Sequence, residues 1–311
     1  MKSMSISDSR RLQMLEWREG ILDTVLDTDT ATEVDDPFAV SYLLLSPERF
    51  RVKAIYAAPF AMNERTQDPA AGMEMSYQEI LRIMKLCGKQ GCCEVKRGSC
   101  SYLPGKDIPV ESKAALDLAE RAMCYSSDNP LYVIGIGAGT NIASALLLNP
   151  EIRERIVIVW LAGNDFTESP NTYNVYQDVK AAQVIFDSGV PLLHVPCNYV
   201  TSHMLTSVPE LESCLGNRND LCDYLISIVK AYGKDYFAWG KTIWDIGAVG
   251  CLMDKDWSIR EITTAPIITD ELTWSRDYTR HLVGNIKEVN RDRIFRDAFL
   301  KMGSLKTGEN R

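Results

Sequence analysis

The sequence predicts an α/β fold, a single domain with a mostly parallel central sheet flanked by helices. The first observation is the middle of the chain, residues 131–195, where short apolar runs alternate with longer helical stretches. That alternation is typical of parallel strands joined by crossover helices. The second observation is continuity, because the 311 residues contain no linker, composition break or internal repeat. We therefore expect an N-terminal arm over residues 1–20 and one domain over residues 21–311.

Apolar runs and helix-start residues predict the elements of the first part of the chain. Asp35, Asp36 and Pro37 are favoured in the first turn of a helix. Ser112 is a favoured N-cap residue. The expected strands cover 21–26 and 52–56, and the expected helices cover a short stretch of the arm, 38–45, 76–86 and 112–123.

The middle of the chain is the most regular part, and the last part is predicted to be mainly helical. In the middle we expect strands over 131–135, 156–161 and 192–195, and helices over 140–148 and 179–187. After residue 200 we expect helices over 209–215, 219–232, 245–252 and 291–302. Ligands of such sheets bind at the carboxyl ends of the strands. The acids at 27–36 and the loops at 136–139 and 163–174 are expected at that edge.

Composition narrows the class of protein and its partners. The net charge is −8 and the isoelectric point is about 5.1, so a nucleic acid or an anionic membrane has no electrostatic support as a partner. No apolar run reaches the roughly 20 residues that span a bilayer, and the N-terminus lacks the apolar region of a signal peptide. The nine cysteines form no Cys-x-x-Cys pair, which favours reduced thiols in a cytoplasmic protein.

The segment from Asp27 to Asp36 contains five carboxylates within ten residues. Like charges at that density are costly unless a cation or hydrogen bonds offset their repulsion. Calcium prefers six to eight hard oxygen ligands in flexible geometry, and this segment supplies several. The alternative is that two of the acids only cap the helix that follows.

Two other interpretations of the motifs are disfavoured. Asp27-Thr28-Asp29 fits the first half of an Asp-x-Asp phosphatase motif, but Ala31 stands where that motif has Thr or Val, and no partnering Lys is evident. The glycines from Gly135 to Gly139 have the spacing G-x-G-x-G, whereas dinucleotide binding uses G-x-G-x-x-G. A tight turn between strand and helix explains these glycines better.

Four ordered stretches resemble motifs of the inosine–uridine nucleoside hydrolase family and together span most of the chain. They are Asp27-Thr28-Asp29 with Asp35-Asp36, Gly135 to Ala143, Thr172-Tyr173-Asn174 with Asp178, and Trp244-Asp245. The family's amino-terminal signature is D-x-D-x-G-x-D-D, and this chain has two extra residues between Asp29 and Asp35. It is more similar to a branch with the pattern D-T-D-x-x-x-E-V-D-D.

The resemblance implies an open Rossmann-like fold and a calcium-dependent hydrolase of ribonucleosides that yields base and ribose. Asp29, Asp36, the backbone carbonyl of Ile136 and Asp245 are implied as ligands of Ca²⁺. Asp29 is the implied general base toward the water at the metal, because it reaches both. Asp27 is implied as support behind these ligands. The family commonly forms homodimers or homotetramers.

The resemblance also assigns substrate contacts. Asp35 and Asn174 are implied to bind ribose hydroxyls, and Asn63 is a further candidate. Trp244 stands where several members have His, and since an indole cannot act as an acid, we expect it to stack on the base. Nearby aromatic residues between 232 and 239 are candidates to extend that surface. Thr172 replaces a family Glu near the 5′ side of the sugar.

The departures at Thr172 and Trp244 leave two activities open. The leading hypothesis is hydrolysis of the N-glycosidic bond of a ribonucleoside. The alternative is a calcium-dependent protein that binds a ribosyl ligand with little or no turnover. The sequence leaves the base preference and the 5′ substituent of the sugar undetermined.

Overall fold

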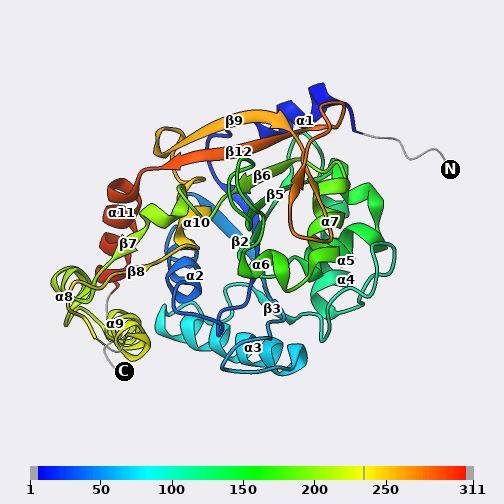
Figure 1. The fold of residues 1–311 in the computed structure, drawn as a ribbon. Coiled ribbons are helices and arrows are strands. Elements are labelled where there is room, and N and C mark those ends of the chain that lie inside the picture. Colours follow the sequence, from blue (N-terminus) through cyan, green and yellow to red (C-terminus); the bar gives the residue numbers. More distant parts are fainter. Residues whose placement is uncertain (1–5, 234, 306–311) are drawn as a thin grey trace.

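An eight-stranded sheet forms the centre of the computed structural model, which describes residues 6–233 and 235–305 (Figure 1). In chain order its strands are β1 (Leu22–Thr28), β2 (Phe50–Ala57), β3 (Glu94–Arg97), β4 (Leu131–Gly135), β5 (Ile156–Leu161), β6 (Leu192–Val195), β9 (Ser258–Thr264) and β12 (Leu282–Val289). The spatial order is β3-β2-β1-β4-β5-β6-β12-β9. Every neighbouring pair is parallel except β12 and β9. The predicted fold class is confirmed.

The remaining elements are helices and two small β-ribbons. The α-helices are α1 (Asp8–Leu15), α2 (Asp36–Leu44), α3 (Pro69–Leu86), α4 (Lys113–Arg121), α5 (Thr140–Leu148), α6 (Tyr173–Tyr176), α7 (Val179–Asp187), α8 (Val208–Leu215), α9 (Asp220–Tyr232), α10 (Ile246–Gly250) and α11 (Arg291–Gly303). The ribbons pair β7 (Leu205–Thr206) with β8 (Lys241–Thr242), and β10 (Ile267–Ile268) with β11 (Trp274–Ser275). Short 3₁₀ helices cover Ala122–Cys124, Pro150–Glu154, Thr201–His203 and Lys255–Trp257.

Local capping explains where several helices begin. Ser112 is the N-cap of α4, as predicted, and its hydroxyl accepts a hydrogen bond from the amide of Ala115 at 3.1 Å. Helix α3 begins at Pro69 instead of the expected residue 76. The cause is Asp68, whose carboxylate accepts from the amide of Ala70 and caps the helix just before the proline.

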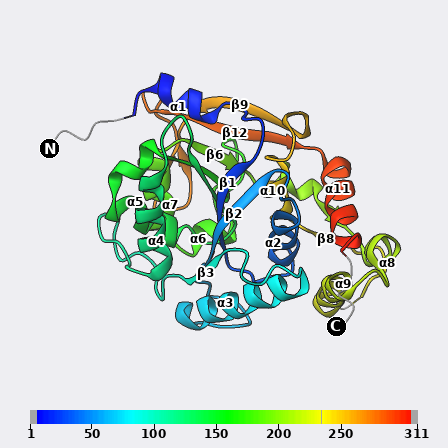
Figure 2. The ribbon, with the colours of Figure 1, turned by 180° about the vertical axis from the view of Figure 1, so that it is seen from behind.

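Helices cover both faces of the sheet, and the strands alternate between two cores. Both views place α4, α5 and α7 on one face, and α2, α10 and α11 on the other (Figures 1 and 2). On β1, Val25 packs in the first core and Leu26 in the second, and on β4 the same holds for Val133 and Ile134. Successive side chains of a strand point to opposite faces, so central strands of this sheet are apolar throughout.

The last third of the chain corrects the expectation of a mainly helical region, because β9 and β12 join the sheet. In β12 the pair Gly284-Asn285 interrupts the apolar pattern that signals a strand. Asn285 is buried there because its amide donates to Asp165 at 3.1 Å and its Oδ1 meets His194 Nδ1 at 2.9 Å. Strand β9 lies at the edge of the sheet and is largely exposed, which weakens its hydrophobic signal.

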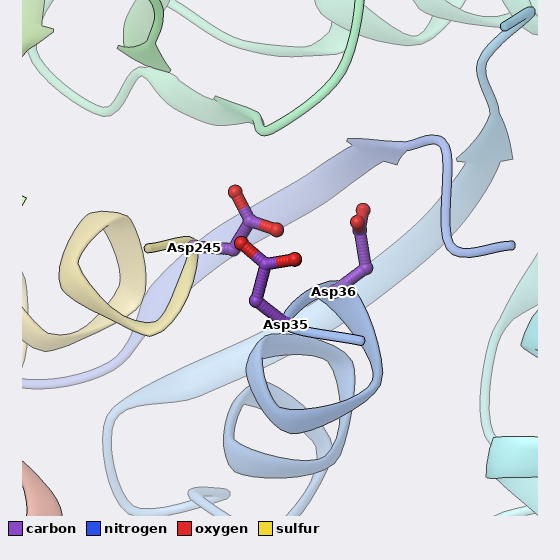
Figure 3. Close-up of side chains that lie close together, drawn as sticks. All are labelled: Asp35, Asp36 and Asp245. Atoms are coloured by element: carbon purple, nitrogen blue, oxygen red, sulfur yellow. The ribbon is translucent and has the colours of Figure 1, made fainter. Parts of the chain in front are cut away.

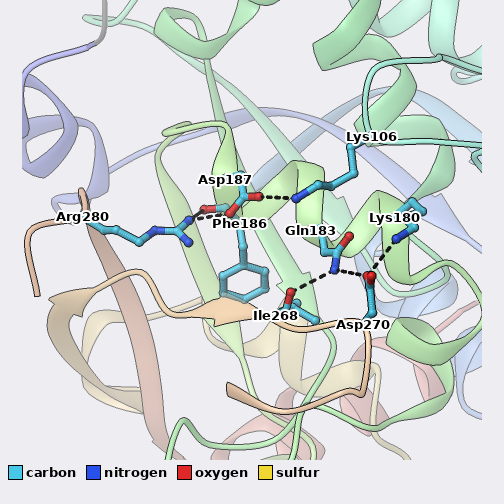
Figure 4. A network of polar contacts seen from close by, with 8 residues as sticks. All are labelled: Lys106, Lys180, Gln183, Phe186, Asp187, Ile268, Asp270 and Arg280. Atoms are coloured by element: carbon cyan, nitrogen blue, oxygen red, sulfur yellow. Dashed lines mark hydrogen bonds and ion pairs between the residues drawn. The ribbon is translucent and has the colours of Figure 1, made fainter. Parts of the chain in front are cut away.

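Polar contacts connect the segment before β12 to helix α7 (Figure 4). Gln183 Nε2 donates to the carbonyl of Ile268 at 3.0 Å and to Asp270 Oδ1 at 2.8 Å. Asp187 lies 2.8 Å from Arg280 Nη2 and 3.3 Å from Lys106 Nζ. The contacts of Gln183 hold the β10–β11 ribbon against α7, and those of Asp187 connect the same helix to Arg280 and Lys106.

The N-terminal segment and the thiols complete the fold. Helix α1 packs beside β12, and its Met14 and Leu15 are buried. All nine cysteines are free thiols. Among the described residues, no helix has both the length and the apolar character that a bilayer-spanning segment needs.

Candidate functional site

A cavity of about 250 Å³ opens at the carboxyl ends of β1, β4 and β5. The predicted site residues that line it are Asp29, Asp35, Asp36, Ile136, Thr172, Asn174, Trp244 and Asp245. Residues from distant parts of the chain meet here because parallel strands end at one edge of the sheet: Asp29 follows β1, Ile136 follows β4 and Leu161 ends β5. Of the predicted set, only Asn63 lies outside this lining.

The turn after β1 positions Asp29. The amide of Thr32 donates to the carbonyl of Asp29 at 2.7 Å, and the Thr32 hydroxyl donates to Asp29 Oδ2 at 2.9 Å. On the other side Gly137 approaches so closely that a Cβ there would lie 2.9 Å from Asp29 Oδ1. The glycine-rich turn after β4 is therefore needed for space beside this carboxylate.

Three other carboxylates meet in one place (Figure 3). Oxygen atoms of Asp35, Asp36 and Asp245 lie within 4.8 Å of one another, and all three side chains are buried. Asp35 and Asp245 occupy the N-cap positions of α2 and α10, but neither side chain makes a capping hydrogen bond. The capping interpretation therefore does not explain them. Asp29 lines the same cavity without belonging to this group of three.

Burial and mutual repulsion raise the pKa of every carboxyl in the cluster. Burial, and repulsion from Asp35 and Glu33, raise the pKa of Asp29 to about 7. Burial and Glu33 raise the pKa of Asp35 to about 6, against the attraction of Lys241. For the carboxyl groups of Asp36 and Asp245 the pKa lies well above the ordinary value, first because they are buried and second because of the neighbouring aspartates.

We predict that the metal-free protein loses stability as pH rises. The folded carboxyls bind protons more tightly than the unfolded ones, whose pKa is about 3.9. Their contribution is therefore fully present below about pH 4 and is lost as pH passes the folded pKa values of about 6 for Asp35 and about 7 for Asp29. In EGTA the urea midpoint should be higher at pH 5.5 than at pH 8. Saturating calcium should raise the pH 8 midpoint most, and a metal-free protein more stable at pH 8 would contradict the prediction.

Ile136, whose carbonyl is predicted as a ligand, lines the cavity, and that carbonyl is held by Asn174. Asn174 Nδ2 donates to the carbonyl oxygens of Ile136 and Leu161, each at 2.9 Å. A carbonyl oxygen has two lone pairs, so the Ile136 oxygen retains one for a further partner. Behind the cluster, Asp27 is fully buried and accepts from Asn141 Nδ2 at 2.8 Å.

Three predicted substrate contacts have different surroundings. Thr172 lines the cavity, and its hydroxyl accepts from the amide of Gly163 at 2.7 Å. Trp244 is half-buried and lines the cavity next to Asp245. Asn63 instead donates to the Tyr173 hydroxyl at 2.9 Å, and its Oδ1 accepts from the backbone of its own turn.

A second cavity of about 890 Å³ adjoins the first. Three residues line both, namely Thr32, Glu33 and Tyr173. The second cavity extends past the ends of β1 and β2 to α3 and α9, and its further lining includes Asn63, Arg65, Glu79, Arg82, Tyr224 and Tyr232. Of the expected aromatic extension only Tyr232 lies there. Tyr236 and Trp239 pack on each other, and Phe237 is 90 % exposed.

An ion pair that the sequence does not reveal lies at the boundary of the two cavities. Lys241 Nζ lies 2.7 Å from Glu33 Oε1, and the lysine is only 5 % exposed. Burial lowers the pKa of Lys241, but the carboxylates of Asp35 and Glu33 outweigh that effect and raise it. The lysine is thus a permanent cation beside the cluster. No local pattern marks it, because it stands more than two hundred residues from Glu33 along the chain.

The donor set fits a hard divalent cation. The predicted ligands Asp29, Asp36, Asp245 and the Ile136 carbonyl all line the cavity and offer only oxygen atoms, which calcium prefers over nitrogen or sulfur. Asp35, whose carboxylate lies with those of Asp36 and Asp245, is a further oxygen donor. Buried carboxylates at this spacing need either protons or a cation to offset their repulsion. The nearby Lys241 is engaged with Glu33 and does not form an ion pair with these ligands.

Comparison with known proteins identifies the family. Residues 24–295 match the model of the family described as inosine-uridine preferring nucleoside hydrolase. The chain is 25% identical over 233 residues to a probable uridine nucleosidase 2 of Arabidopsis thaliana, which covers 67% of this chain and 69% of the relative. It is 27% identical over 194 residues to the pyrimidine-specific ribonucleoside hydrolase RihA of Escherichia coli, which covers 55% of this chain and 59% of that enzyme.

Solved structures of the same fold extend the likeness over nearly the whole chain. A purine-preferring ribonucleoside hydrolase from Gardnerella vaginalis superposes with a TM-score of 0.75 at 21% identity, covering 91% of this chain and 98% of that one. An inosine-uridine preferring nucleoside hydrolase from Bacillus anthracis gives a TM-score of 0.69 at 16% identity, covering 92% and 100%. The fold, the acid-lined cavity and the family match agree, and this chain belongs to the inosine-uridine preferring nucleoside hydrolase family, a family of N-glycosyl hydrolases.

Proposed function

We propose that this protein hydrolyses the N-glycosidic bond of ribonucleosides to free base and ribose, with Ca²⁺ held at the aspartate cluster. The observation that carries the proposal is the cavity itself. Four buried carboxylates, a free carbonyl lone pair and the Asn174 side chain converge in a space beside a second, larger cavity. A nucleoside has the same division into a polar sugar and a flat base.

Asp29 is the proposed general base. Thr32 holds Oδ2 of this carboxylate, and Oδ1 lies beside the turn at Gly137. Asp29 accepts the proton of a water whose oxygen forms the new bond to the anomeric carbon. The bond from that carbon to the base nitrogen breaks with its electron pair passing to the base, through an oxocarbenium-like transition state.

The other residues bind and orient. Asp36, Asp245 and the Ile136 carbonyl would hold the cation with Asp29. The cation supplies positive charge that orders the attacking water and the sugar hydroxyls. Asp35 accepts hydrogen bonds from the 2′- and 3′-hydroxyls.

Asn174 completes the sugar contacts, and it also holds the backbone carbonyls of Ile136 and Leu161, which line the cavity. Its Nδ2 is used by two backbone carbonyls, so its Oδ1 is the atom available to a sugar hydroxyl. Glu33 and its partner Lys241 lie where the sugar and base would join, since Glu33 lines both cavities.

Trp244 is expected to stack on the base. Replacing it with alanine should lower kcat/KM by about tenfold to a hundredfold, because stacking of an aromatic side chain on a base contributes roughly 1–3 kcal/mol. Trp244→Phe keeps an aromatic ring and serves as the matched control, with a loss of only a few-fold. Initial rates with inosine and uridine measure both. Equal losses for alanine and phenylalanine would contradict stacking.

A substrate panel tests the proposed function. The protein is incubated with inosine, uridine, guanosine and adenosine, without phosphate, and released ribose and base are measured in calcium and in EGTA. We expect equimolar base and ribose from at least one nucleoside in calcium, and none in EGTA. A protein that binds a nucleoside in calcium but releases no ribose would instead fit the alternative of ribosyl-ligand binding without turnover.

A further inference from the structure

The first cavity has two chemically different ends. One end holds the carboxylates that follow β1 and precede α10. The other end follows β5 and β6 and is lined by Leu161, Asn164, Asn171, Thr172, Cys197 and Asn198. None of these side chains is charged at neutral pH, since burial raises the pKa of the Cys197 thiol to about 12. We call this the neutral end.

Polar groups at the neutral end already have partners or face water. The Thr172 hydroxyl accepts from the amide of Gly163. Asn164 Oδ1 accepts from the amide of Asn198 at 3.0 Å, and its Nδ2 donates to the carbonyl of Ser169 at 2.8 Å. The side chains of Asn171 and Asn198 are exposed. In the described part of the chain, no buried polar atom without a partner lies at this end.

The order of the strands decides which part of a nucleoside reaches the neutral end. Along the sheet edge the second cavity lies past β1 on the side of β2, whereas β5 and β6 lie on the opposite side of β1 and β4. In a ribofuranose, C1′ carries the base and C4′ carries the C5′ group, and these two carbons flank the ring oxygen. The base and C5′ therefore point in different directions, and the 2′,3′-diol lies on the opposite side of the ring. With the diol at the carboxylates and the base toward the second cavity, C5′ points to the neutral end.

We propose that the neutral end receives the C5′ substituent without requiring a hydroxyl there. The protein is then a hydrolase of 5′-deoxy and 5′-alkylthio ribonucleosides as well as of the parent compounds, and it rejects ribonucleoside 5′-phosphates. This inference rests on the proposed function. A site that buries polar groups for a substrate hydroxyl rejects an analogue without it by 10⁴–10⁵-fold, because those groups lose their partner. Here no buried group would lose one.

Phosphate is disfavoured by charge. A 5′-phosphate would bring about two negative charges into a cavity that is already lined by five carboxylates, those of Asp29, Glu33, Asp35, Asp36 and Asp245. None of its lining residues at the neutral end is a cation, and Lys241 lies at the other end beside Glu33. The neutral end therefore separates nucleosides from nucleotides.

The test compares inosine and uridine with their 5′-deoxy, 5′-methylthio and 5′-monophosphate forms, using the whole protein in calcium. We expect kcat/KM of the deoxy and methylthio forms within about tenfold of the parent, and of the monophosphates at least a hundredfold lower. A larger loss for the deoxy forms, or monophosphates as good as the parent, would overturn the inference while leaving the proposed function intact. If no parent nucleoside is cleaved, the proposed function fails and this inference with it.

A charge placed at the neutral end gives an independent measurement. Asn198→Lys adds a cation to an exposed position, and it should raise the ratio of monophosphate to parent kcat/KM by about tenfold. Asn129→Lys adds the same charge to an exposed turn before β4, at the opposite edge of the sheet, and is the matched control. Equal ratios for the two variants would show that C5′ does not lie near Asn198 and would overturn the inference.

Discussion

Replacing Asp29 with asparagine is expected to lower kcat by about 10²–10⁴-fold, the range that a positioned general base contributes. The asparagine keeps the size of the side chain and an oxygen beside Gly137, but it cannot accept the proton of the attacking water. Ribose release from the best substrate of the panel measures the effect, with calcium at saturation so that weaker metal binding does not limit the rate.

Asp23→Asn is the matched control for this change. Asp23 lies on the same strand, β1, but outside the cavity, where it pairs with Arg51 and Lys53. We expect this variant to keep the activity of the unaltered protein. An Asp29→Asn protein that retains more than a tenth of the original kcat would exclude Asp29 as the base.

Removing the cation is expected to abolish turnover. In EGTA, ribose release should fall to background and return when calcium is added in excess. Asp245→Asn removes one of the buried ligands, and it should weaken calcium binding by at least about tenfold, because affinity depends on the charge and number of the ligands. The affinity is measured by isothermal calorimetry, with calcium titrated into the chelator-treated protein.

An exposed aspartate controls for the loss of charge. Asp256 lies in the 3₁₀ turn Lys255–Trp257, outside both cavities. Asp256→Asn should bind calcium as the unaltered protein does. Binding of calcium by Asp245→Asn with undiminished affinity would show that the cation is held elsewhere.

Local signals in the sequence were sufficient for the parallel half of the fold. Apolar runs that end in aspartates or glycines mark β1 and β4, and the strand-edge rule then brings Asp29 to Ile136. The apolar-run signal fails for β12, because this strand contains the polar residue Asn285. Asn285 is buried only because His194 and Asp165 provide its hydrogen bonds. His194 lies on β6 and Asp165 in the loop after β5, so no window along the chain reveals these partners.

The site residues also divide into those that local sequence signals predict and those that depend on contacts in the folded chain. Carboxylates grouped in the sequence near Asp35 were predictable, since spacing and chemistry agree. Lys241 was not, because its role depends on a contact with Glu33 that only the folded chain creates. Asn63 stands in a suitable loop after β2, yet its amide is used by Tyr173. Position in a loop does not determine where an amide points.

A crystal structure of the Asp29→Asn protein with calcium and an uncleaved ribonucleoside would show directly whether the aspartate cluster holds the cation and the ribose. We expect one calcium ion about 2.3–2.6 Å from oxygens of Asp36, Asp245 and the Ile136 carbonyl. We also expect the ribose diol at Asp35, the base toward Tyr232 in the second cavity, and C5′ toward Asn198. A nucleoside bound away from the aspartates, or a cation held by other residues, would contradict the proposed function.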